Sequence, residues 1–336
     1  MEGTDALIIE NDWLSVRSLV DKGNAHLLSE TISKTLAASR SGSGGKKPDG
    51  TFKDLVPQPI TTYETKALKR AFSLKQSFTN QRWNEINKEK YESILKILNT
   101  TSVDFEKEII SKLSELMGMT LGEISERFGI KVPRGKNAAA TIVKKAIGFK
   151  QVNSRIKEFE QLGIQVKTIP TRESDFKPWE SMSFPTFKLK ELIAERFYEG
   201  ENEGGDKWEC CSLLEDINRI LFIPILRNER EGVPTEASVI GKPFFWSPTN
   251  EQLDTIEMEW NTYINEIKNG KVKVTKVPQL NGYREVSGLR NESNTEIIHI
   301  RPHGRDRTDR DEDHLGNSIV KQSFWLNKNF LQKLLV

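Results

Sequence analysis

The stretch GIQVKTIP, from Gly163 to Pro170, has the β-branched residues and the alternation that are typical of a strand. Successive side chains of a strand point to opposite faces, so Gln165 and Lys167 share one face. A carboxylate in the place of Gln165 would make, with the lysine, a pair suited to metal chemistry. An amide is a much weaker metal ligand than a carboxylate. This polar face therefore belongs either to an altered metal-dependent site or to a protein of the same fold with another function.

Outward from this strand, short apolar runs alternate with helical segments. Helical periodicity is present at 12–36, where it is broken at Gly23, and 120–149 predicts two helices separated by a Pro-Gly loop. Residues 84–118 are charged and helical, and residues 70–79 read as a strand leading into a helix. Further strand-like runs occur at 183–189, 219–226, 240–246 and 295–301. The pattern predicts an α/β fold of the mixed α+β kind.

Composition bounds the function only loosely. The 336 residues suffice for two domains, and 50 Lys and Arg against 48 Asp and Glu leave a net charge of +2. This balance neither demands nor excludes nucleic acid, because acids elsewhere can offset a basic face. Cys210 and Cys211 are adjacent, and two thiols make neither a favourable disulfide nor a zinc site. We expect a reducing cytoplasm, no signal peptide and no membrane span.

The chain partly repeats itself. DWLSVRSLVDKG at 12–23 is similar to EWNTYINEIKNG at 259–270, with an acid, a tryptophan, a helix and a glycine eleven residues after the acid. RAFSLKQSF at 70–78 is similar to KQSFWLNKNF at 321–330, where Phe72 matches Phe324. Two matches in the same order predict a duplicated unit.

Several segments together resemble the MutH mismatch-repair nuclease and the related type II restriction endonucleases that cut at GATC. They are, in order, GNAHLLSE (23–30), RAFSLK (70–75), KWECCSLLEDINRILFIPI (207–225), IGKPFFWSPTNEQ (240–252), EIIHIRPHGRDRTD (296–309) and KQSFWLNKNF (321–330). The resemblance implies a restriction-endonuclease-like, MutH-type fold, with a mixed central sheet flanked by helices and a partial second copy.

The resemblance also implies a division into domains. The related restriction enzymes look like two MutH-type domains in tandem, of which the first cuts and the second binds another copy of the site as an effector. We therefore expect 1–85 to be the C-terminal, DNA-recognition portion of a first MutH-like domain. Residues 86–118 would be a helical connector, and residues 119–336 a complete domain acting as effector or pseudo-nuclease. The front half of the first copy is not expected within these residues.

The family's active site carries over poorly. Such nucleases hold Mg²⁺ with carboxylates and use a lysine near the attacking water. The resemblance places Lys144, Glu158, Gln165 and Lys167 at the four positions, so two expected acids are a lysine and an amide. We expect this degenerate site to be inactive, with no metal and no cofactor for this chain, although Mg²⁺ serves the family's active domain. The alternative is a Mg²⁺-dependent endonuclease that uses Glu158, Glu160 and Lys167.

The expected DNA-reading residues survive. The resemblance implies an arginine from the strand end IRPH and an aromatic residue from the last strand. It assigns these roles to Arg301, with His303 and Arg305 beside it, and to Trp325. Arg307 and Arg310 complete a basic cluster suited to phosphate contacts. A solvated charged loop is the alternative, because five acids interleave with these arginines.

The partial copy has basic residues of its own. A flexible segment at 38–50 carries three cations, further cations flank the strand at 70–75, and a serine takes the place of the aromatic residue. The candidate DNA-binding residues here are Arg40, Lys46, Lys47, Lys69, Arg70, Ser73 and Lys75.

Three functions remain open on the sequence. The first is a non-cleaving effector that binds double-stranded DNA at a GATC-like site, alone or as a dimer on DNA. A separate catalytic nuclease domain or chain would then be its partner, with no membrane involved. The second is a Mg²⁺-dependent restriction endonuclease. The third is a folded remnant that binds nothing, which a salt titration of DNA binding would separate from the first.

Overall fold

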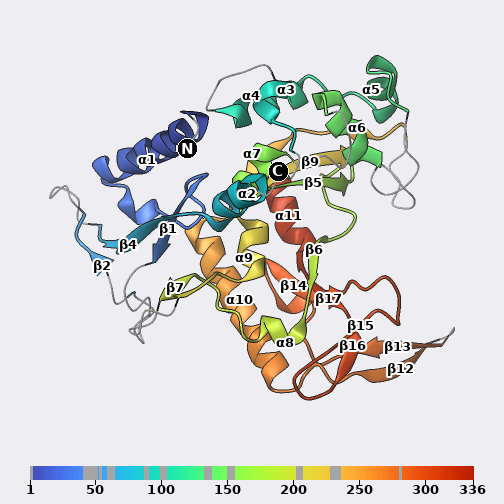
Figure 1. Cartoon of the computed structure of the whole chain (residues 1–336). Coiled ribbons are helices and arrows are strands. Elements are labelled where there is room, and N and C mark those ends of the chain that lie inside the picture. Colours follow the sequence, from blue (N-terminus) through green and yellow to red (C-terminus); the bar gives the residue numbers. More distant parts are fainter. Residues whose placement is uncertain are drawn as a thin grey trace. The chain divides into compact units, whose positions relative to one another are not determined.

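The structure is a computed structural model and describes residues 3–40, 52, 55–58, 65–86, 91–98, 104–131, 138–149, 156–201, 207–227, 236–279 and 282–336. Its contacts divide the chain into two compact units (Figure 1). Unit 1 comprises Met1–Pro170 and Ile217–Asn250, and unit 2 comprises Thr171–Asp216 and Glu251–Val336. These units describe packing, and the domain boundaries expected from the resemblance stay a prediction.

Unit 1 holds the N-terminal elements, with one four-stranded and two two-stranded sheets among its described residues. Its helices are α1 (Gly3–Asp21), η1 (Ala25–Leu27), α2 (Gln76–Ile86), α3 (Ile94–Ile97), α4 (Phe105–Ser114), α5 (Leu121–Arg127), α6 (Ala138–Ile147) and α7 (Lys157–Gln161). Its strands are β1 (Leu36–Arg40), β2 (Leu55–Val56), β3 (Ala67–Leu68), β4 (Arg70–Leu74), β5 (Ile164–Thr171), β9 (Arg219–Leu226), β10 (Val239–Ile240) and β11 (Phe244–Trp246).

The core of unit 1 forms around β9. Its sequence RILFIPIL is an almost unbroken apolar run, typical of a strand covered on both faces, and six consecutive residues of it are buried. Strands β10 and β11 pair with it antiparallel, and β5 also pairs with it. Leu221 and Ile223 pack in one cluster with apolar side chains of α4, α5 and α6, such as Ile109 and Ile142.

One expected strand is divided. The run 240–246 forms β10 and β11 rather than one strand. Gly241 N still donates to Pro224 O of β9 at 2.8 Å, but Pro243 has no N–H to continue the ladder, which resumes at Phe244. A Cβ on Gly241 would lie 2.8 Å from the Cβ of Pro224, so the close approach requires glycine there.

Unit 2 holds the C-terminal elements. Its helices are α8 (Leu189–Leu192), α9 (Ser212–Ile217), α10 (Asn250–Lys268), η2 (Glu292–Asn294) and α11 (Lys328–Leu335). Its strands are β6 (Met182–Phe187), β7 (Gly200–Glu201), β8 (Lys207–Trp208), β12 (Thr275–Gln279), β13 (Gly282–Val286), β14 (Ile298–Pro302), β15 (Arg310–Glu312), β16 (Ser318–Val320) and β17 (Gln322–Leu326).

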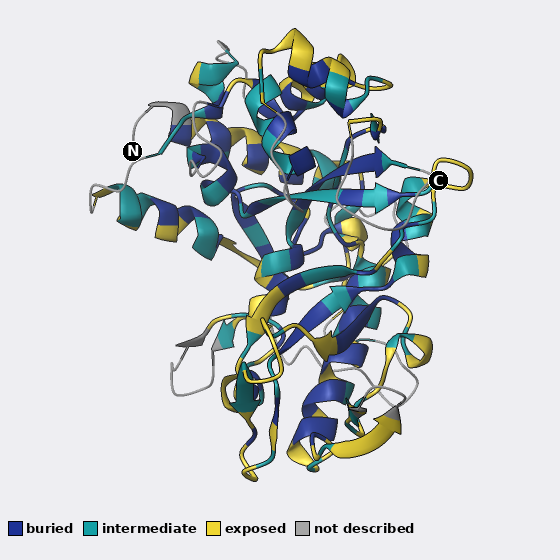
Figure 2. Ribbon diagram, turned by 90° about the vertical axis from the view of Figure 1, so that its right-hand side faces the viewer, coloured by how far each residue is buried: buried dark blue, intermediate teal, exposed yellow. Residues whose placement is uncertain are grey.

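The central sheet of unit 2 has the order β14–β17–β6, all antiparallel. One face of it is apolar: the Phe324 ring lies 5.0 Å from that of Phe187 and 6.2 Å from that of Tyr263, a buried residue of α10. The opposite face carries the polar positions of the strands, because side chains alternate. Figure 2 shows buried residues on the central strands and helices, with exposed residues on loops, on outer faces of helices and on an outer strand.

The predicted repeat is present as the same order of elements. The series α1, β1, β4, α2 in unit 1 corresponds to α10, β14, β17, α11 in unit 2. The strand registers agree as well, because Leu36 pairs with Leu74 as Ile298 pairs with Leu326. Both copies therefore place equivalent residues of the two strands opposite each other.

Local hydrogen bonds repeat with the elements. Lys75 N donates to Thr35 O at 2.8 Å, and at the matching positions Asn327 N donates to Ile297 O at 2.8 Å. The glycine after each helix is left-handed, with φ of 73° at Gly23 and 75° at Gly270. The matching hydrogen bonds and glycine conformations support the interpretation that the two segments are copies of one structural unit.

Among the described residues, we find no helix that is both long enough and apolar enough to span a membrane.

Candidate nucleic-acid interface

The polar face of the β14–β17–β6 sheet brings together the two residues expected to read DNA. Arg301 is exposed near the end of β14, and its guanidinium carbon lies 4.6 Å from the centre of the Trp325 ring on β17. Strand register explains the meeting, because Arg301 pairs with Ser323, two residues from Trp325. The cation is thus held over an aromatic face while its N–H groups remain available.

His303 belongs to the same cluster. It is exposed just after β14, its ring centre is 5.1 Å from that of Trp325, and its Nδ1 is 3.1 Å from Ser323 Oγ. Two groups with different hydrogen-bonding capacities, the guanidinium of Arg301 and the imidazole of His303, therefore lie against one indole ring. Such a set can contact a base edge and the adjoining backbone together.

A buried histidine supports this cluster from below. His299 stacks on Trp325 with ring centres 6.5 Å apart, and its Nδ1 is 2.6 Å from the amide oxygen of Asn327. Burial lowers the pKa of His299, and the charge of Arg301 lowers it further, against the opposing effects of Asn327 and Glu292. The ring is therefore a neutral spacer that fixes the tryptophan rather than a charged contact.

The acids of the following loop are used within the protein. Asp309 accepts from the backbone N–H of Arg305 at 3.0 Å and pairs with Lys321 at 2.7 Å. Asp313 is buried and accepts from the backbone N–H groups of Leu315 and Asn317. These carboxylates shape the loop, which favours an outward basic surface over a loop of evenly solvated charges.

The arginines of the loop divide into two groups. The side chains of Arg305 and Arg307 are exposed. Arg305 Nε lies 3.6 Å from the carboxylate of Asp309, and the Arg307 guanidinium lies 5.3 Å from the centre of the Tyr283 ring. Arg310 instead pairs with Glu285 at 3.2 Å and donates to Ser318 Oγ at 2.9 Å. We expect Arg310 to hold the loop in place, which leaves Arg301, Arg305 and Arg307 as the outward cations.

In the partial copy, two candidate cations serve packing. The side chain of Arg70 is 5% exposed, pairs with Glu30 at 3.2 Å and donates to the carbonyls of Leu28 and Ala38. Lys75 Nζ donates to Asn218 Oδ1 at 2.7 Å. Neither is placed as a surface contact for DNA.

The other candidates there are more open. Lys69 and Ser73 are exposed, and the guanidinium of Arg40 lies 5.0 Å from the centre of the Phe52 ring. Lys46 and Lys47 lie outside the described residues. Of the described candidate cations of this copy, Lys69 is therefore exposed, and Arg40 is half-buried beside Phe52.

The residues of the degenerate nuclease site fall on consecutive elements of unit 1. Lys144 is in the last turn of α6, Glu158 on α7, and Gln165 and Lys167 on β5, all but Glu158 half-buried. Glu158 is buried, and its two oxygens accept from Ser93 Oγ at 2.6 Å and from the Ile94 N–H at 2.7 Å. This carboxylate holds the start of α3.

The residues present do not fit a Mg²⁺ site of the family's kind. Gln165 offers one neutral carbonyl, Lys144 is a cation, and the Glu158 carboxylate is engaged at α3. Among the residues that the structure describes, no three His, Cys, Asp or Glu side chains lie together as a metal-binding group.

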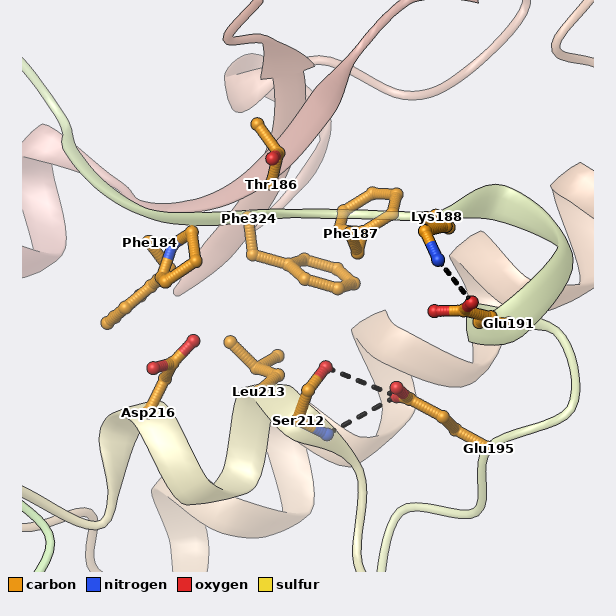
Figure 3. Close-up of a pocket in the computed structure, with 11 residues that line it drawn as sticks. Phe184, Thr186, Phe187, Lys188, Glu191, Glu195, Ser212, Leu213, Asp216 and Phe324 are labelled. Atoms are coloured by element: carbon orange, nitrogen blue, oxygen red, sulfur yellow. Dashed lines mark hydrogen bonds and ion pairs between the residues drawn. The ribbon is translucent and has the colours of Figure 1, made fainter. Parts of the chain in front are cut away.

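Sequence reasoning did not foresee a cavity of about 240 Å³ in unit 2, between β6 and α9 (Figure 3). Phenylalanine rings form one wall, and Glu195 accepts from Ser212 N–H at 3.3 Å on the other. Burial raises the pKa of Glu195. The carboxylates that line this cavity would repel a phosphate group. We therefore do not assign the cavity to the DNA-binding surface. No periodicity could have revealed it, because its lining comes from three separate segments.

An exposed apolar face in the partial copy was also missed. Phe72 and Leu74 are each 39% exposed, whereas their counterparts Phe324 and Leu326 are 3% and 0% exposed. Trp13 is 46% exposed and its counterpart is 2% exposed. In unit 2 this face is covered by rings of the preceding segment, from Phe187 and Phe197.

The chain is similar to known DNA mismatch repair and type II restriction enzymes. The sequence profile of the family described as DNA mismatch repair enzyme MutH matches residues 147–259. The type II restriction enzyme Sau3AI of Staphylococcus aureus is 26% identical over 359 aligned residues, covering 98% of this chain and 70% of that enzyme. MutH of Actinobacillus pleuropneumoniae serotype 3 is 28% identical, covering 60% of this chain and 77% of its own length, and MutH of Haemophilus ducreyi is 27% identical, covering 68% and 92%.

Proposed function

We propose that this chain, a distant homologue of MutH and of the type II restriction enzyme Sau3AI over most of its length, is the DNA-binding effector part of such a restriction endonuclease. It binds duplex DNA at a GATC-like site and does not cut it alone. Its fold is restriction-endonuclease-like, and it acts in the cytoplasm.

The observation that carries the proposal is the Arg301–Trp325 pair. A guanidinium held 4.6 Å from the ring centre of an indole has a defined orientation before DNA arrives, which reduces the entropy lost on binding. Its fork suits the O6 and N7 acceptors of guanine in the major groove. Arg305 and Arg307 then fit contacts to phosphates beside the read base pair.

The non-cleaving part of the proposal rests on the nuclease-site positions. Lys144 and Gln165 stand where the resemblance places acids, and the carboxylate of Glu158 is engaged with α3. Phosphodiester hydrolysis by a Mg²⁺ nuclease needs carboxylates that hold the ion at the scissile phosphate. The chain's own residues would therefore position DNA without supplying the reaction.

A separate nuclease domain or chain would supply the cleavage of DNA. We place its contact on the face formed by Trp13, Phe72 and Leu74, because the same face in unit 2 is covered by rings of the segment that precedes its repeat. Exposed apolar groups of this size favour a protein partner. The described cations Arg40 and Lys69 lie in the same copy and would add contacts to DNA.

The test compares binding with cleavage. A labelled GATC duplex in EDTA should be shifted in a gel by this chain more strongly than a duplex lacking the site. A plasmid carrying GATC should remain uncut in Mg²⁺. Site-specific cleavage that disappears in Lys167→Ala would instead establish a Mg²⁺-dependent endonuclease using Glu158, Glu160 and Lys167. Absence of any shift would make the chain a remnant that binds nothing.

A further inference from the structure

A β-hairpin that the sequence did not predict stands beside the basic loop of unit 2. Strands β12 and β13 pair only with each other among the described strands (Figure 1). Lys276, Val277 and Tyr283 on it are exposed. An isolated two-stranded hairpin is at best marginally stable in water, so contacts outside it must hold it.

One ion pair joins the hairpin to the loop that follows β14, the strand of Arg301. Glu285 on β13 accepts from Arg310 at 3.2 Å, and Arg310 also donates to the Ser318 carbonyl at 2.8 Å. Glu285 is the one acid in the hairpin sequence from Thr275 to Val286. Because Arg310 neutralises it, the remaining charge of the hairpin is positive.

Two cations meet on the ring of Tyr283. Lys276 Nζ lies 4.5 Å and the Arg307 guanidinium 5.3 Å from its centre. Within the described part of the chain neither side chain makes an ion pair with a carboxylate. Like charges brought onto one ring repel each other, and an anion bound between them would relieve that repulsion.

We propose that Lys276, Tyr283 and Arg307, the Tyr283 cluster, form a phosphate-binding site for the DNA backbone that extends the surface of Arg301 and Trp325. The inference rests on the proposed function, since it names a second contact of the same DNA-binding surface. Arg307 joins the two parts, because it lies in the loop that directly follows β14 and contacts the hairpin ring.

The chemistry favours a phosphodiester over other anions. An arginine fork and a lysine point charge on one aromatic ring can hold two oxygens of one phosphate or two neighbouring phosphates. The cluster is exposed and open, as contact with a long backbone requires. A β-ribbon is also narrow enough to lie along a DNA groove.

The test measures DNA binding of the full chain at several salt concentrations. Lys276→Ala and Arg307→Ala should each weaken cognate and random duplexes to the same extent and lower the salt slope by about one. Lys333→Ala, an exposed lysine of α11 paired with Glu296, is the matched control and should change neither. Phosphate-ethylation interference should show one or two positions for the wild type that are missing in both variants.

The tyrosine variants separate a positioning role from a general loss of charge. Tyr283→Phe keeps the ring and should bind as the wild type does. Tyr283→Ala should lower the salt slope although no charge is removed, with thermal unfolding confirming that unit 2 is folded. Specific binding by the wild type with unchanged slopes in all variants would overturn the cluster and leave the proposed function standing. No binding of duplex DNA by the wild type would overturn both.

Discussion

Asp12 and Glu259 hold the same position in two copies of one structural unit. Asp12 on α1 accepts from the side chains of Ser33 and Thr35 and from the backbone N–H of Thr35, the residue before β1. Glu259 on α10 accepts from the N–H groups of Glu296, Ile297 and Ile298, at the start of β14. In each copy a buried acid of the long helix fixes where the first strand begins.

The first prediction follows from this role. Glu259→Ala leaves buried backbone N–H groups without an acceptor, and we expect it to lower the free energy of unfolding by about 2–4 kcal/mol. Asp12→Ala should destabilise to a similar extent. Urea unfolding measures both free energies. The control is Thr255→Ala on α10, which removes one hydrogen bond from the Thr255 hydroxyl to the Glu251 carbonyl. Its free energy of unfolding should stay within about 0.5 kcal/mol of the wild type.

A pH dependence of stability accompanies Glu259. Burial raises its pKa above 4.5 and nearby Glu296 adds to this, although the backbone N–H groups oppose the shift. The unfolded carboxyl thus loses its proton first as pH rises, so stability falls from about pH 4.5 until the folded carboxyl is also ionised. Urea unfolding from pH 4.5 to 8 should show this component in the wild type but not in Glu259→Gln. The same slope in both would assign it to another group.

Arg301 should contribute to sequence discrimination. Arg301→Ala should cost about 1–3 kcal/mol on a GATC duplex and less on a random one. Arg301→Lys should recover charge but not discrimination, because lysine lacks the planar fork. Fluorescence anisotropy on the two duplexes measures both quantities. Equal losses on both would reduce Arg301 to a phosphate contact, and no loss would remove it from the interface.

Arg310 should act through Glu285 rather than through DNA. The two side chains are 29% and 19% exposed, so their pair is partly shielded from solvent. We expect a coupling of about 0.5–1.5 kcal/mol in a double-mutant cycle of Arg310→Ala and Glu285→Ala, measured by unfolding. If Arg310→Ala instead lowers the salt slope of DNA binding by a full charge without changing stability, it contacts phosphate directly.

Restoring acids tests the degenerate nuclease site. Lys144→Glu with Gln165→Glu should raise the affinity for Mg²⁺, measured by titration calorimetry, because two carboxylates replace a cation and an amide. Cleavage need not follow, since geometry that is not held by its surroundings is rarely precise enough. Unchanged Mg²⁺ affinity would show that the two positions do not face a common site.

Hydrophobic alternation and repeated motifs in the sequence predicted the parts of the fold that are determined by residues close together in the sequence. The strand around Lys167 and the duplicated helix and strand could be inferred from alternation and from the matching Phe72 and Phe324. The pairing of Arg310 with Glu285 could not, because the two residues are 25 positions apart and meet only after the hairpin folds back. Arg70 is a candidate for DNA contact on the sequence, but its side chain is buried against carbonyls that converge from two other segments.

The agreement in register between the copies has a consequence for engineering. Ser39 in β1 occupies the place of Arg301, and Ser73 in β4 that of Trp325. The first copy thus provides the same strand frame without the reading side chains. Ser73 is exposed but Ser39 is buried, so Ser39→Arg with Ser73→Trp would build a second reading pair only where the new arginine extends to the surface as Arg301 does. One polypeptide would then be bivalent for DNA, and its avidity for a duplex with two sites would depend on their spacing.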